Sequence, residues 1–529
     1  MKNERMKNKK MIYDRNTLIC KRFNRALRLF VFFIFHSFIF HSLISCDDYD
    51  KFTTDRSAVL QFSVDQVVFD TLITTCPSAT KTLTVFNRGD AGLRIREVHL
   101  AGGADSPFRI NIDGQDMSRT VDNRVTDFEV RRRDSIMVRA EVTVPEWNSD
   151  DPMPVSDQLV FTLESGVVQQ VTLSAVGQDA FYLKARTLTA DTTLSARRPI
   201  LVSGGLTVAE GATLTMEAGT HLLFHDDAGM TVDGRLVVQG TLENPVVFRG
   251  DRTDHIFDYL PYDRLPGRWQ GITVTSKSLG NELNYADIHG GTYGIVCALP
   301  EKDADMKPVT DETPVKMTLT NSVITNTKGP GLVLYDSRVT VANTEISNTL
   351  GHCVDVVGGD VTFTFCTLAQ FYPLDANRGN ALHIANVYDG KYHALHRGDF
   401  VNCVITGYSD DVVMGEWMDP AALPADVSQA EENYHFINCF LATEIPTGAE
   451  FVDRFVGCVY DDPQSERAHD KNFLLMDTHA LIYDFTPVSD SQIREMANPA
   501  YVVDWPLDRR GRNRSTDNGP DAGCYEYTE

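Results

Sequence analysis

Basic residues are scarce in this chain. Its 529 residues hold 49 Lys and Arg against 73 Asp and Glu, which gives a formal net charge of −24 at pH 7. Because so acidic a surface repels phosphate backbones, the composition argues against a nucleic-acid partner. The ten cysteines form no C-x-x-C pair and no Cys/His spacing typical of zinc, so no metal site and no resident cofactor are predicted.

A ten-residue pattern occurs three times at intervals of 22 residues. It reads MTLTNSVITN at 317–326, VTVANTEISN at 339–348 and VTFTFCTLAQ at 361–370. Each copy places apolar residues two apart, which predicts strands and not helices. Short strands that recur every 20–25 residues or so are typical of a solenoid. The repeat therefore predicts an all-β fold in which residues 181–460 form a parallel β-helix with three short strands per coil.

Two further stretches resemble a known superfamily. GRWQGITV (267–274) is similar to a W-x-G-I coil, and DRRGRNR…GPDAGCYEY (508–527) is similar to a C-terminal tail, both found in right-handed parallel β-helix repeat proteins of the pectate-lyase-like superfamily. The resemblance covers residues 185–529. It implies a right-handed β-helix and a closing segment at 461–529. It does not select a function, because this fold hosts lyases, hydrolases, adhesins and inactive proteins.

Residues 55–180 follow a different pattern. Alternating runs such as KTLTVFN (81–87), LRIREVHL (93–100) and SIMVRAEVTV (135–144), separated by polar turns, predict a β-sandwich. The succession of LTVFNRG (83–89), LRI (93–95), FRI (108–110) and LSAVG (173–177) resembles the immunoglobulin-like domains of the ASPM/SPD-2/hydin group. That resemblance implies a spacer or interaction module without a catalytic motif.

The N-terminal segment is expected to be a lipoprotein signal peptide over residues 1–45. Ten basic residues precede an apolar run that ends in Leu43-Ile-Ser-Cys46, which resembles the lipobox of bacterial lipoproteins. The resemblance implies that Cys46 carries the lipid, and residues 46–54, which begin with two Asp, resemble the acidic export tether of surface lipoproteins in Bacteroidota-type bacteria. The predicted location is thus the outer membrane, anchored by lipid and facing the cell surface. An ordinary signal peptide or membrane anchor is the alternative, and translation could begin at Met6 or Met11.

Two columns of equivalent positions are predicted to have structural roles. The first column contains only small side chains, at Ala286, Ser322, Thr344, Cys366, Cys403, Cys439 and Cys458. Cysteine suits such an inward column as a small apolar side chain, so free thiols are favoured, with disulfides between coils as the alternative. The second column, Asn321, Asn343, Asn402 and Asn438, is predicted to form a ladder of amides at a turn.

The candidate catalytic residues come from a second repeated block, Gly-x-x-φ-x-φ with φ apolar, at 329–334, 351–356 and 379–384. Because alternate residues of a strand face opposite ways, Val333, Asp355 and His383 form an outward column. A carboxylate beside an imidazole is a plausible acid–base pair, although two solvated side chains are the alternative. Asp410 or Asp411 could supply the second carboxyl that an inverting glycosidase needs at roughly 6.5–9.5 Å.

Four residues on long loops are predicted to contact a ligand. Trp417 could stack on a sugar ring beside Glu416, or it could anchor its own loop. Tyr388 and His393 add an aromatic ring and hydrogen-bonding groups. The long loops themselves are either functional or plain insertions.

Two enzyme patterns are incomplete in the sequence. Polygalacturonase-like hydrolases carry an Asp pair followed by Gly-His-Gly, whereas here Gly351-His352-Cys353 precedes Asp410-Asp411. Pectate-lyase-like enzymes use an Arg or Lys base with calcium, and the outward column offers no such base. The prediction is a surface lipoprotein that binds a polysaccharide or an envelope partner without cleaving it. The alternatives are a divergent lyase, for which calcium is possible, a glycoside hydrolase, and a purely architectural protein.

Overall fold

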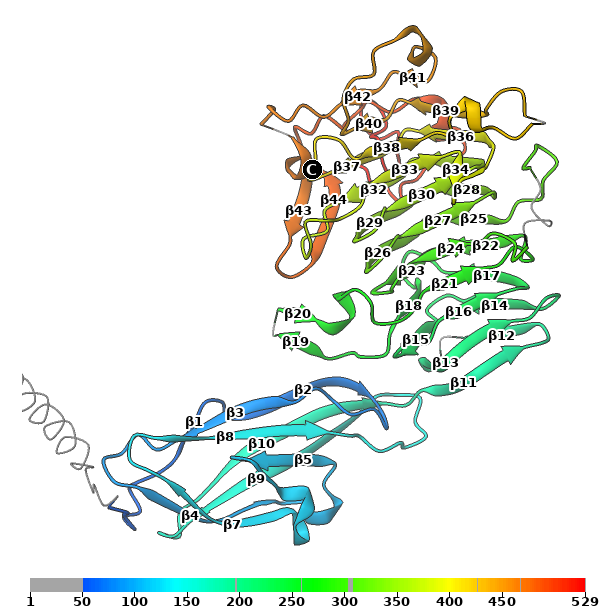
Figure 1. Cartoon of the computed structure of the whole chain (residues 1–529). Coiled ribbons are helices and arrows are strands. Elements are labelled where there is room, and N and C mark those ends of the chain that lie inside the picture. The colour runs from blue at the N-terminus through cyan, green and yellow to red at the C-terminus, as the bar shows by residue number, and fades with distance from the viewer. Residues whose placement is uncertain are drawn as a thin grey trace, which may run out of the picture.

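The computed structural model describes residues 51–195, 197–257, 259–302, 308–425, 427–466 and 468–528. Cys46 and the preceding signal segment lie outside the described residues. The described chain is all-β, with a sandwich followed by a long stack of parallel strands (Figure 1). The helical segments within this part are 3-10 turns of at most five residues.

The sandwich consists of two five-stranded sheets. In spatial order, one sheet holds β1 (Gln61–Phe62), β3 (Lys81–Phe86), β8 (Ser135–Val142), β5 (Phe108–Ile112) and β6 (Gln115–Asp116), and the other holds β2 (Gln66–Ile73), β10 (Val168–Gln178), β9 (Met153–Leu163), β4 (Leu93–Leu100) and β7 (Arg124–Val130). Alternate residues are buried along β8, so one face of the strand supplies the core. β2 was missed by the sequence patterns, and it pairs in parallel with β10.

The solenoid begins with two long strands, β11 (Phe181–Leu188) and β13 (Ile200–Val208), and then repeats three short strands per coil. The first series is β12 (Thr192–Leu194), β14 (Thr213–Glu217), β17 (Arg235–Gln239), β22 (Asn281–Asn284), β25 (Met317–Thr320), β28 (Arg338–Ala342), β31 (Gly359–Thr364), β36 (Leu395–Val401), β39 (Glu432–Ile437) and β41 (Phe455–Val456). The second series is β15 (His221–His225), β18 (Val246–Gly250), β23 (Ala286–His289), β26 (Val323–Thr327), β29 (Glu345–Thr349), β32 (Thr367–Gln370), β37 (Val404–Gly407), β40 (Phe440–Leu441) and β42 (Val459–Tyr460). The third series is β16 (Met230–Val232), β21 (Ile272–Val274), β24 (Ile295–Cys297), β27 (Leu332–Tyr335), β30 (Val354–Val357), β33 (Leu382–Ala385) and β38 (Val413–Glu416).

The parallel β-helix predicted from the repeat is confirmed by the strand register. Met317 pairs with Val339 and Val339 with Val361, in each case in parallel and one coil apart. Leu332 pairs with Val354 in the same way. The 22-residue period therefore equals one coil.

The core is a set of stacked columns. Phe363, Phe400, Phe436 and Phe455 occupy successive coils of the first series, with ring centroids 4.9, 5.1 and 5.0 Å apart and planes within 17°. Trp269 of the GRWQGITV segment is also internal, where it stacks on Phe224 at 4.4 Å and donates a hydrogen bond to the His289 carbonyl. Such pairs add offset stacking to apolar burial.

The small column is present as the sequence predicted. Cys366, Cys403 and Cys439 are fully buried, and Cys458 is half-buried at the last coil. The residue after each of these cysteines pairs with its counterpart in the next coil. The pairs are Thr367 with Val404, Val404 with Phe440, and Phe440 with Val459. The eight cysteines of the described chain are free thiols, which is the favoured of the two alternatives.

The asparagine column turns the chain between the first and second series. Asn321, Asn343, Asn402 and Asn438 have φ near +50°, a left-handed conformation that Asn tolerates better than most residues. The predicted continuous amide ladder is wrong. Asn343 donates to Asn321 at 3.2 Å, but Asn402 accepts from the Asn498 backbone and Asn438 donates to the Met496 carbonyl. The ladder is interrupted because Phe365 occupies the turn between Asn343 and Asn402.

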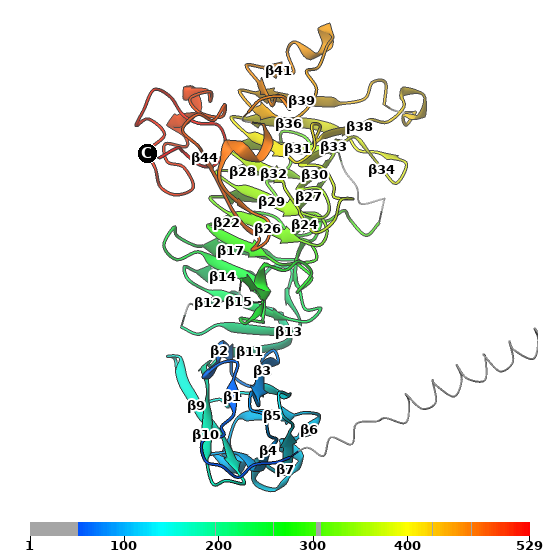
Figure 2. The ribbon, with the colours of Figure 1, turned by 90° about the vertical axis from the view of Figure 1, so that its left-hand side faces the viewer.

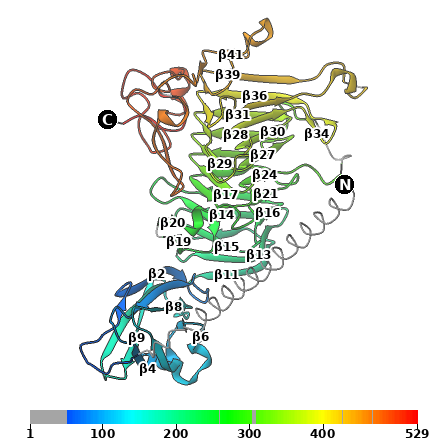
Figure 3. The same cartoon turned by 60° about the vertical axis from the view of Figure 1, so that its left-hand side comes forward.

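The C-terminal segment covers this interruption. It contains the hairpin β43 (Phe473–Asp477) and β44 (Ile482–Pro487) and lies along the flank of the coils (Figures 2 and 3). Arg514 is fully buried, with its guanidinium 3.8 Å from the Phe365 ring centroid and a 2.8 Å hydrogen bond to Asn343 Oδ1. It also forms an ion pair with Glu526. The segment thus seals one side of the second series.

A buried charge cluster lies on the outer face of β23. His289 Nδ1 is 2.8 Å from Asp287 Oδ1, and His289 Nε2 is 3.6 Å from Asp263 Oδ2, which also pairs with Arg249. Burial by itself would lower the pKa of His289, but the two carboxylates outweigh it and raise the pKa to about 9. His289 is therefore an imidazolium at neutral pH.

This cluster predicts a pH-dependent stability. Because the folded pKa lies above the ordinary 6.5, the stabilisation is fully present below pH 6.5 and is lost as pH rises through 9. The difference corresponds to roughly 3 kcal/mol of unfolding free energy. We expect urea midpoints of the wild-type protein to fall more steeply between pH 6.5 and pH 9 than those of His289→Gln. Parallel profiles for the two proteins would contradict the assignment.

Candidate functional site

The outward column of the third series is the candidate site. Val333 pairs with Asp355, Asp355 with His383 and His383 with Met414, so the predicted register is confirmed. Toward the N-terminus the column continues through Val296, Thr273, Thr231 and Thr207. Along these described coils the column contains no Lys or Arg.

His383 lies between two carboxylates from neighbouring coils. Its Nδ1 is 2.7 Å from Asp355 Oδ1, and its Nε2 is 3.5 Å from Glu416 Oε2. The Asp355 side chain is 19% exposed and that of Glu416 is 56% exposed. His383 was expected to face solvent, and this is wrong, because the residue is only 8% exposed. The His352 ring stacks over it at 4.8 Å and covers it.

The two histidines have opposite protonation tendencies. Burial and the adjacent His383 lower the pKa of His352, whose Nδ1 accepts a hydrogen bond from the Asn380 backbone N–H. Burial also acts to lower the pKa of His383, but the hydrogen bond and charge of Asp355, together with Glu416, raise it overall. The ring of His352, which favours the neutral form, therefore stacks on the ring of His383, which favours the protonated form.

Two tyrosines lie at the Asp355 end of this site, where burial, a hydrogen bond with Tyr388 and the charge of Asp355 raise the pKa of Tyr335. Tyr335 and Tyr388 have ring centroids 4.8 Å apart, and Tyr388 is 45% exposed. The prediction that His393 contacts a ligand is not supported by its position. His393 is buried, and its Nδ1 is 2.7 Å from Asp336 Oδ2. The short hairpin of β34 (Val387–Tyr388) and β35 (Lys391–Tyr392) precedes it in the chain. Of these two candidate contacts, only Tyr388 presents a ring to solvent.

Trp417 anchors its own loop, which is one of the two alternatives left open by the sequence. Its ring stacks on Tyr434 at 5.3 Å with planes 8° apart, and it packs against the core. The preceding residue, Glu416, extends toward His383 instead. One face of the Trp417 ring is thus occupied by Tyr434, next to Glu416 in the chain.

Asp410 and Asp411 have other partners. Asp410 Oδ1 is 3.2 Å from His469 Nε2 of the C-terminal segment, and Asp411 Oδ1 accepts a 2.8 Å hydrogen bond from Thr443. Neither hydrogen-bonds to Asp355 or His383. The carboxyl pair of Asp355 with Asp410 or Asp411 that the sequence suggested stays a prediction.

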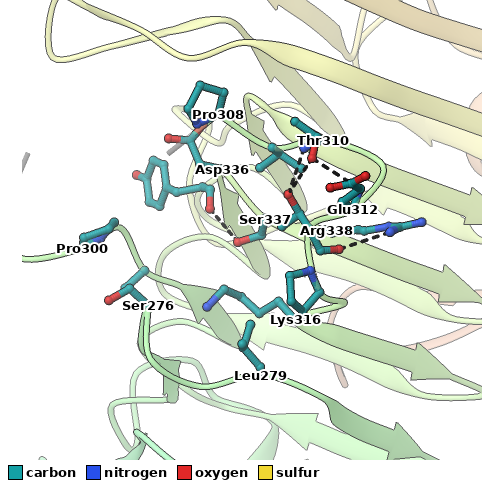
Figure 4. A pocket seen from close by; sticks show the side chains of 15 residues that line it. Ser276, Leu279, Pro300, Pro308, Thr310, Glu312, Lys316, Asp336, Ser337 and Arg338 are labelled. Carbon is teal, nitrogen blue, oxygen red and sulfur yellow. Dashed lines mark hydrogen bonds between the residues drawn. The ribbon is translucent and has the colours of Figure 1, made fainter. Parts of the chain in front are cut away.

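A pocket of about 390 Å³ opens beside Tyr335, and the sequence did not reveal it. Its walls are Leu279, Pro300, Pro308 and neighbouring residues, and its polar groups include Asp336 and Arg338 (Figure 4). Lys316 lies at its base, and burial lowers the pKa of its amine. Its Nζ donates to the Thr275 and Ser278 carbonyls at 2.8 and 3.1 Å. The only sequence signal was the loop at 299–314, which was considered either functional or a plain insertion.

The same described ranges show neither a metal-ligand cluster nor a membrane-spanning helix. They contain no group of three or more His, Cys, Asp or Glu side chains arranged to hold a metal ion. In that part of the chain, no helix has the length and apolar character needed to cross a bilayer.

Comparisons with known proteins give only distant likenesses. No protein-family model and no curated protein sequence matches the chain. The solved catalytic domain of Agl-KA is 12% identical with a TM-score of 0.25, over 69% of this chain and 76% of that chain. The catalytic unit of a thermostable GH87 alpha-1,3-glucanase from Streptomyces thermodiastaticus strain HF3-3 is 11% identical with a TM-score of 0.16, over 68% and 72%. A protein of unknown function from Porphyromonas gingivalis W83 is 18% identical with a TM-score of 0.17, over 26% of this chain and 58% of that chain. TM-scores this low carry no argument about function.

The carboxylate contact predicts how His383 titrates. Replacing Asp355 by Asn removes the hydrogen-bonded charge that raises the pKa of His383, so the midpoint should fall. The ring Cε1–H signal in an NMR titration, assigned with His383→Gln, measures it. Asp399→Asn is the matched control, because Asp399 makes the same kind of contact with His435 at 2.8 Å. An unchanged His383 midpoint in Asp355→Asn would contradict the proposed cause.

Proposed function

We propose that this protein is a lipid-anchored component of the bacterial cell envelope that binds a polysaccharide, or another envelope component, without cleaving it. The observation that carries the proposal is the third-series face, where His383 is held between Asp355 and Glu416 beside the Tyr335–Tyr388 pair. Fixed carboxylates next to an exposed aromatic ring are suited to sugar hydroxyls and to the apolar face of a sugar ring.

The same geometry favours binding over cleavage. His383 Nδ1 is 2.7 Å from Asp355 Oδ1, and Asp355 and Glu416 raise the pKa of the imidazole against the effect of burial. An imidazolium has no lone pair with which to take a proton from a substrate. Within the described column there is no Lys or Arg to serve as a lyase base.

The envelope location rests on the sequence. The apolar run ending in Leu43-Ile-Ser-Cys46 supports lipidation of Cys46, and the following acidic residues support export to the outer face of the outer membrane. A lipid anchor would place the sandwich nearest the membrane, because residue 55 follows the tether directly.

Lipidation is tested by Cys46→Ser. We expect the wild-type chain to partition into the membrane fraction with an acylated N-terminal peptide in mass spectrometry. The variant should lose the acyl mass and leave that fraction, because no other anchor is proposed. A variant that stays membrane-bound with an unchanged acyl signal would refute the assignment.

The binding function is tested by screening the detergent-solubilised full chain against neutral and acidic polysaccharides. Binding is followed by affinity electrophoresis, and cleavage is followed by reducing ends and unsaturated-product absorbance, with and without calcium. Glu416→Gln and Tyr388→Ala should each weaken binding by about tenfold, which corresponds to roughly 1.4 kcal/mol. Glu444→Gln is the control, because Glu444 is an exposed carboxylate on another loop.

Two outcomes would overturn this proposal. Product release that is lost in Asp355→Asn or His383→Gln would make the face an active site of a lyase or hydrolase. Binding that is unchanged in both Glu416→Gln and Tyr388→Ala would remove the face from the binding function, and no binding to any polysaccharide or envelope component would favour an architectural role.

A further inference from the structure

A second cavity lies where the sandwich meets the first coils of the solenoid. It has a volume of about 600 Å³ and is lined by residues 78–82 of the sandwich and by Arg252, His255, Ile256, Phe257 and Tyr262 of the solenoid. This volume is within the range of roughly 300–1,000 Å³ that is common for small-ligand sites. The cavity is called the junction pocket below.

The lining of the junction pocket is positively charged, in contrast to the acidic chain. Lys81, Arg252 and His255 face it, and its lining residues, all in the described part of the chain, include no Asp or Glu. The formal net charge of the whole chain is −24, so a cationic pocket is an exception that requires an explanation. A pocket of this kind attracts an anion.

Two carboxylates that do not line the pocket hold these cations in place. Asp254 is buried and accepts two hydrogen bonds from Arg252, at 2.9 and 2.6 Å. Asp70 Oδ2 is 3.0 Å from His255 Nδ1 and 3.9 Å from Lys81 Nζ. These basic side chains are therefore held in place at the cavity wall by carboxylates behind them.

The two walls are tied together across the domain boundary. The Ala79 backbone N–H donates to Asp254 Oδ2 at 2.9 Å, and Thr253 Oγ1 donates to the Thr71 carbonyl. Tyr182 OH donates to the Thr74 carbonyl at 2.8 Å. These bonds join strands of the sandwich to the start of the solenoid, so the pocket keeps a fixed shape.

An exposed aromatic row leads away from the junction pocket. Phe257 lines the pocket and is 55% exposed, and its ring stacks on that of Tyr259 at 5.5 Å and 12°. Tyr259 in turn stacks on His479, at the tip of the β43–β44 hairpin, at 3.8 Å. Figure 1 shows this hairpin reaching toward β19 (His255–Phe257) and β20 (Leu260–Pro261). Large aromatic rings left in solvent in a row mark a contact surface.

We propose that the junction pocket binds an anionic saccharide. Its carboxylate or sulfate group pairs with Lys81 and Arg252, and its hydroxyls bond to Thr82. Ser78 and Thr80 can only accept from the sugar, because their own hydroxyls donate to the Ala79 carbonyl and to Glu141. The next sugar ring lies on Phe257. An acidic peptide would meet the same cations, but the hydroxyl-rich wall and the aromatic row favour a sugar. This site is separate from the third-series face and does not depend on the function proposed for that face.

The test measures binding of short oligogalacturonates to the detergent-solubilised full chain by calorimetry. Lys81→Gln and Phe257→Ala should each weaken binding about tenfold, and binding should weaken with added salt. Phe257→Ala removes an exposed ring, so it is expected to fold even if the half-buried Lys81 proves sensitive. Lys277→Gln, which neutralises an exposed lysine elsewhere, should bind as the wild type does.

Additional ligands distinguish sulfate from carboxylate as the bound anion, and an additional variant distinguishes the junction pocket from the third-series face. A sulfated chondroitin disaccharide distinguishes sulfate from carboxylate, and either one binding supports the proposal. Neutral dextran oligomers should not bind at this site. Tyr388→Ala should leave oligogalacturonate binding unchanged, so failure of the third-series face and failure of the junction pocket give different results. Equal affinity in Lys81→Gln, Phe257→Ala and the wild type would overturn the inference, as would polyglutamate binding as tightly as the saccharides.

Discussion

Parallel pairing between successive coils places every side chain of the solenoid above its counterpart one coil earlier, about 4.8 Å away. The rest of the structure depends on this constraint, because a column can contain only side chains that tolerate such a neighbour. Phenylalanines satisfy it by stacking, as in the column from Phe363 to Phe455. Small residues satisfy it in the column that ends in four cysteines. Asparagine satisfies it at the left-handed turn, where few other residues adopt the required φ.

The same constraint brings charged groups together on the outer face. Asp355, His383 and Glu416 belong to three successive coils. The register places Asp355 directly beside His383, whereas Met414 is the partner of His383 on the next coil, and Glu416, two residues further along, extends back to the imidazole. On the second series, Asp287 and His289 meet Asp263 and Arg249 in a similar way. Charges that would repel or be desolvated are tolerated there because each has a partner of opposite sign. Stacking thus determines both the core and the pattern of paired charges outside it.

The periodic features could be predicted from the sequence, whereas the features made by non-repeating segments could not. The outward register of Asp355 and His383 follows from counting residues in a repeated block. The burial of His383 does not, because it depends on the His352 ring above it. His393 was placed on a ligand-binding loop, but it lies inside against Asp336. The junction pocket combines residues 78–82 with residues 252–262, and no pattern connects segments so far apart. The lipid anchor at Cys46 stays a prediction.

The docking of the C-terminal segment has a consequence for the order of folding. Arg514 contacts Asn343 across 171 positions of the chain, and Tyr525 contacts Glu345 across 180. A stack of coils can grow one coil at a time as the chain emerges, since each coil needs only its neighbour. The flank around Phe365 and Glu345 cannot be completed in this way, because the segment that covers it follows all the coils in the chain. These contacts therefore form after the coils have stacked, and until then the middle coils expose the Phe365 ring and leave Glu345 without its tyrosine partner.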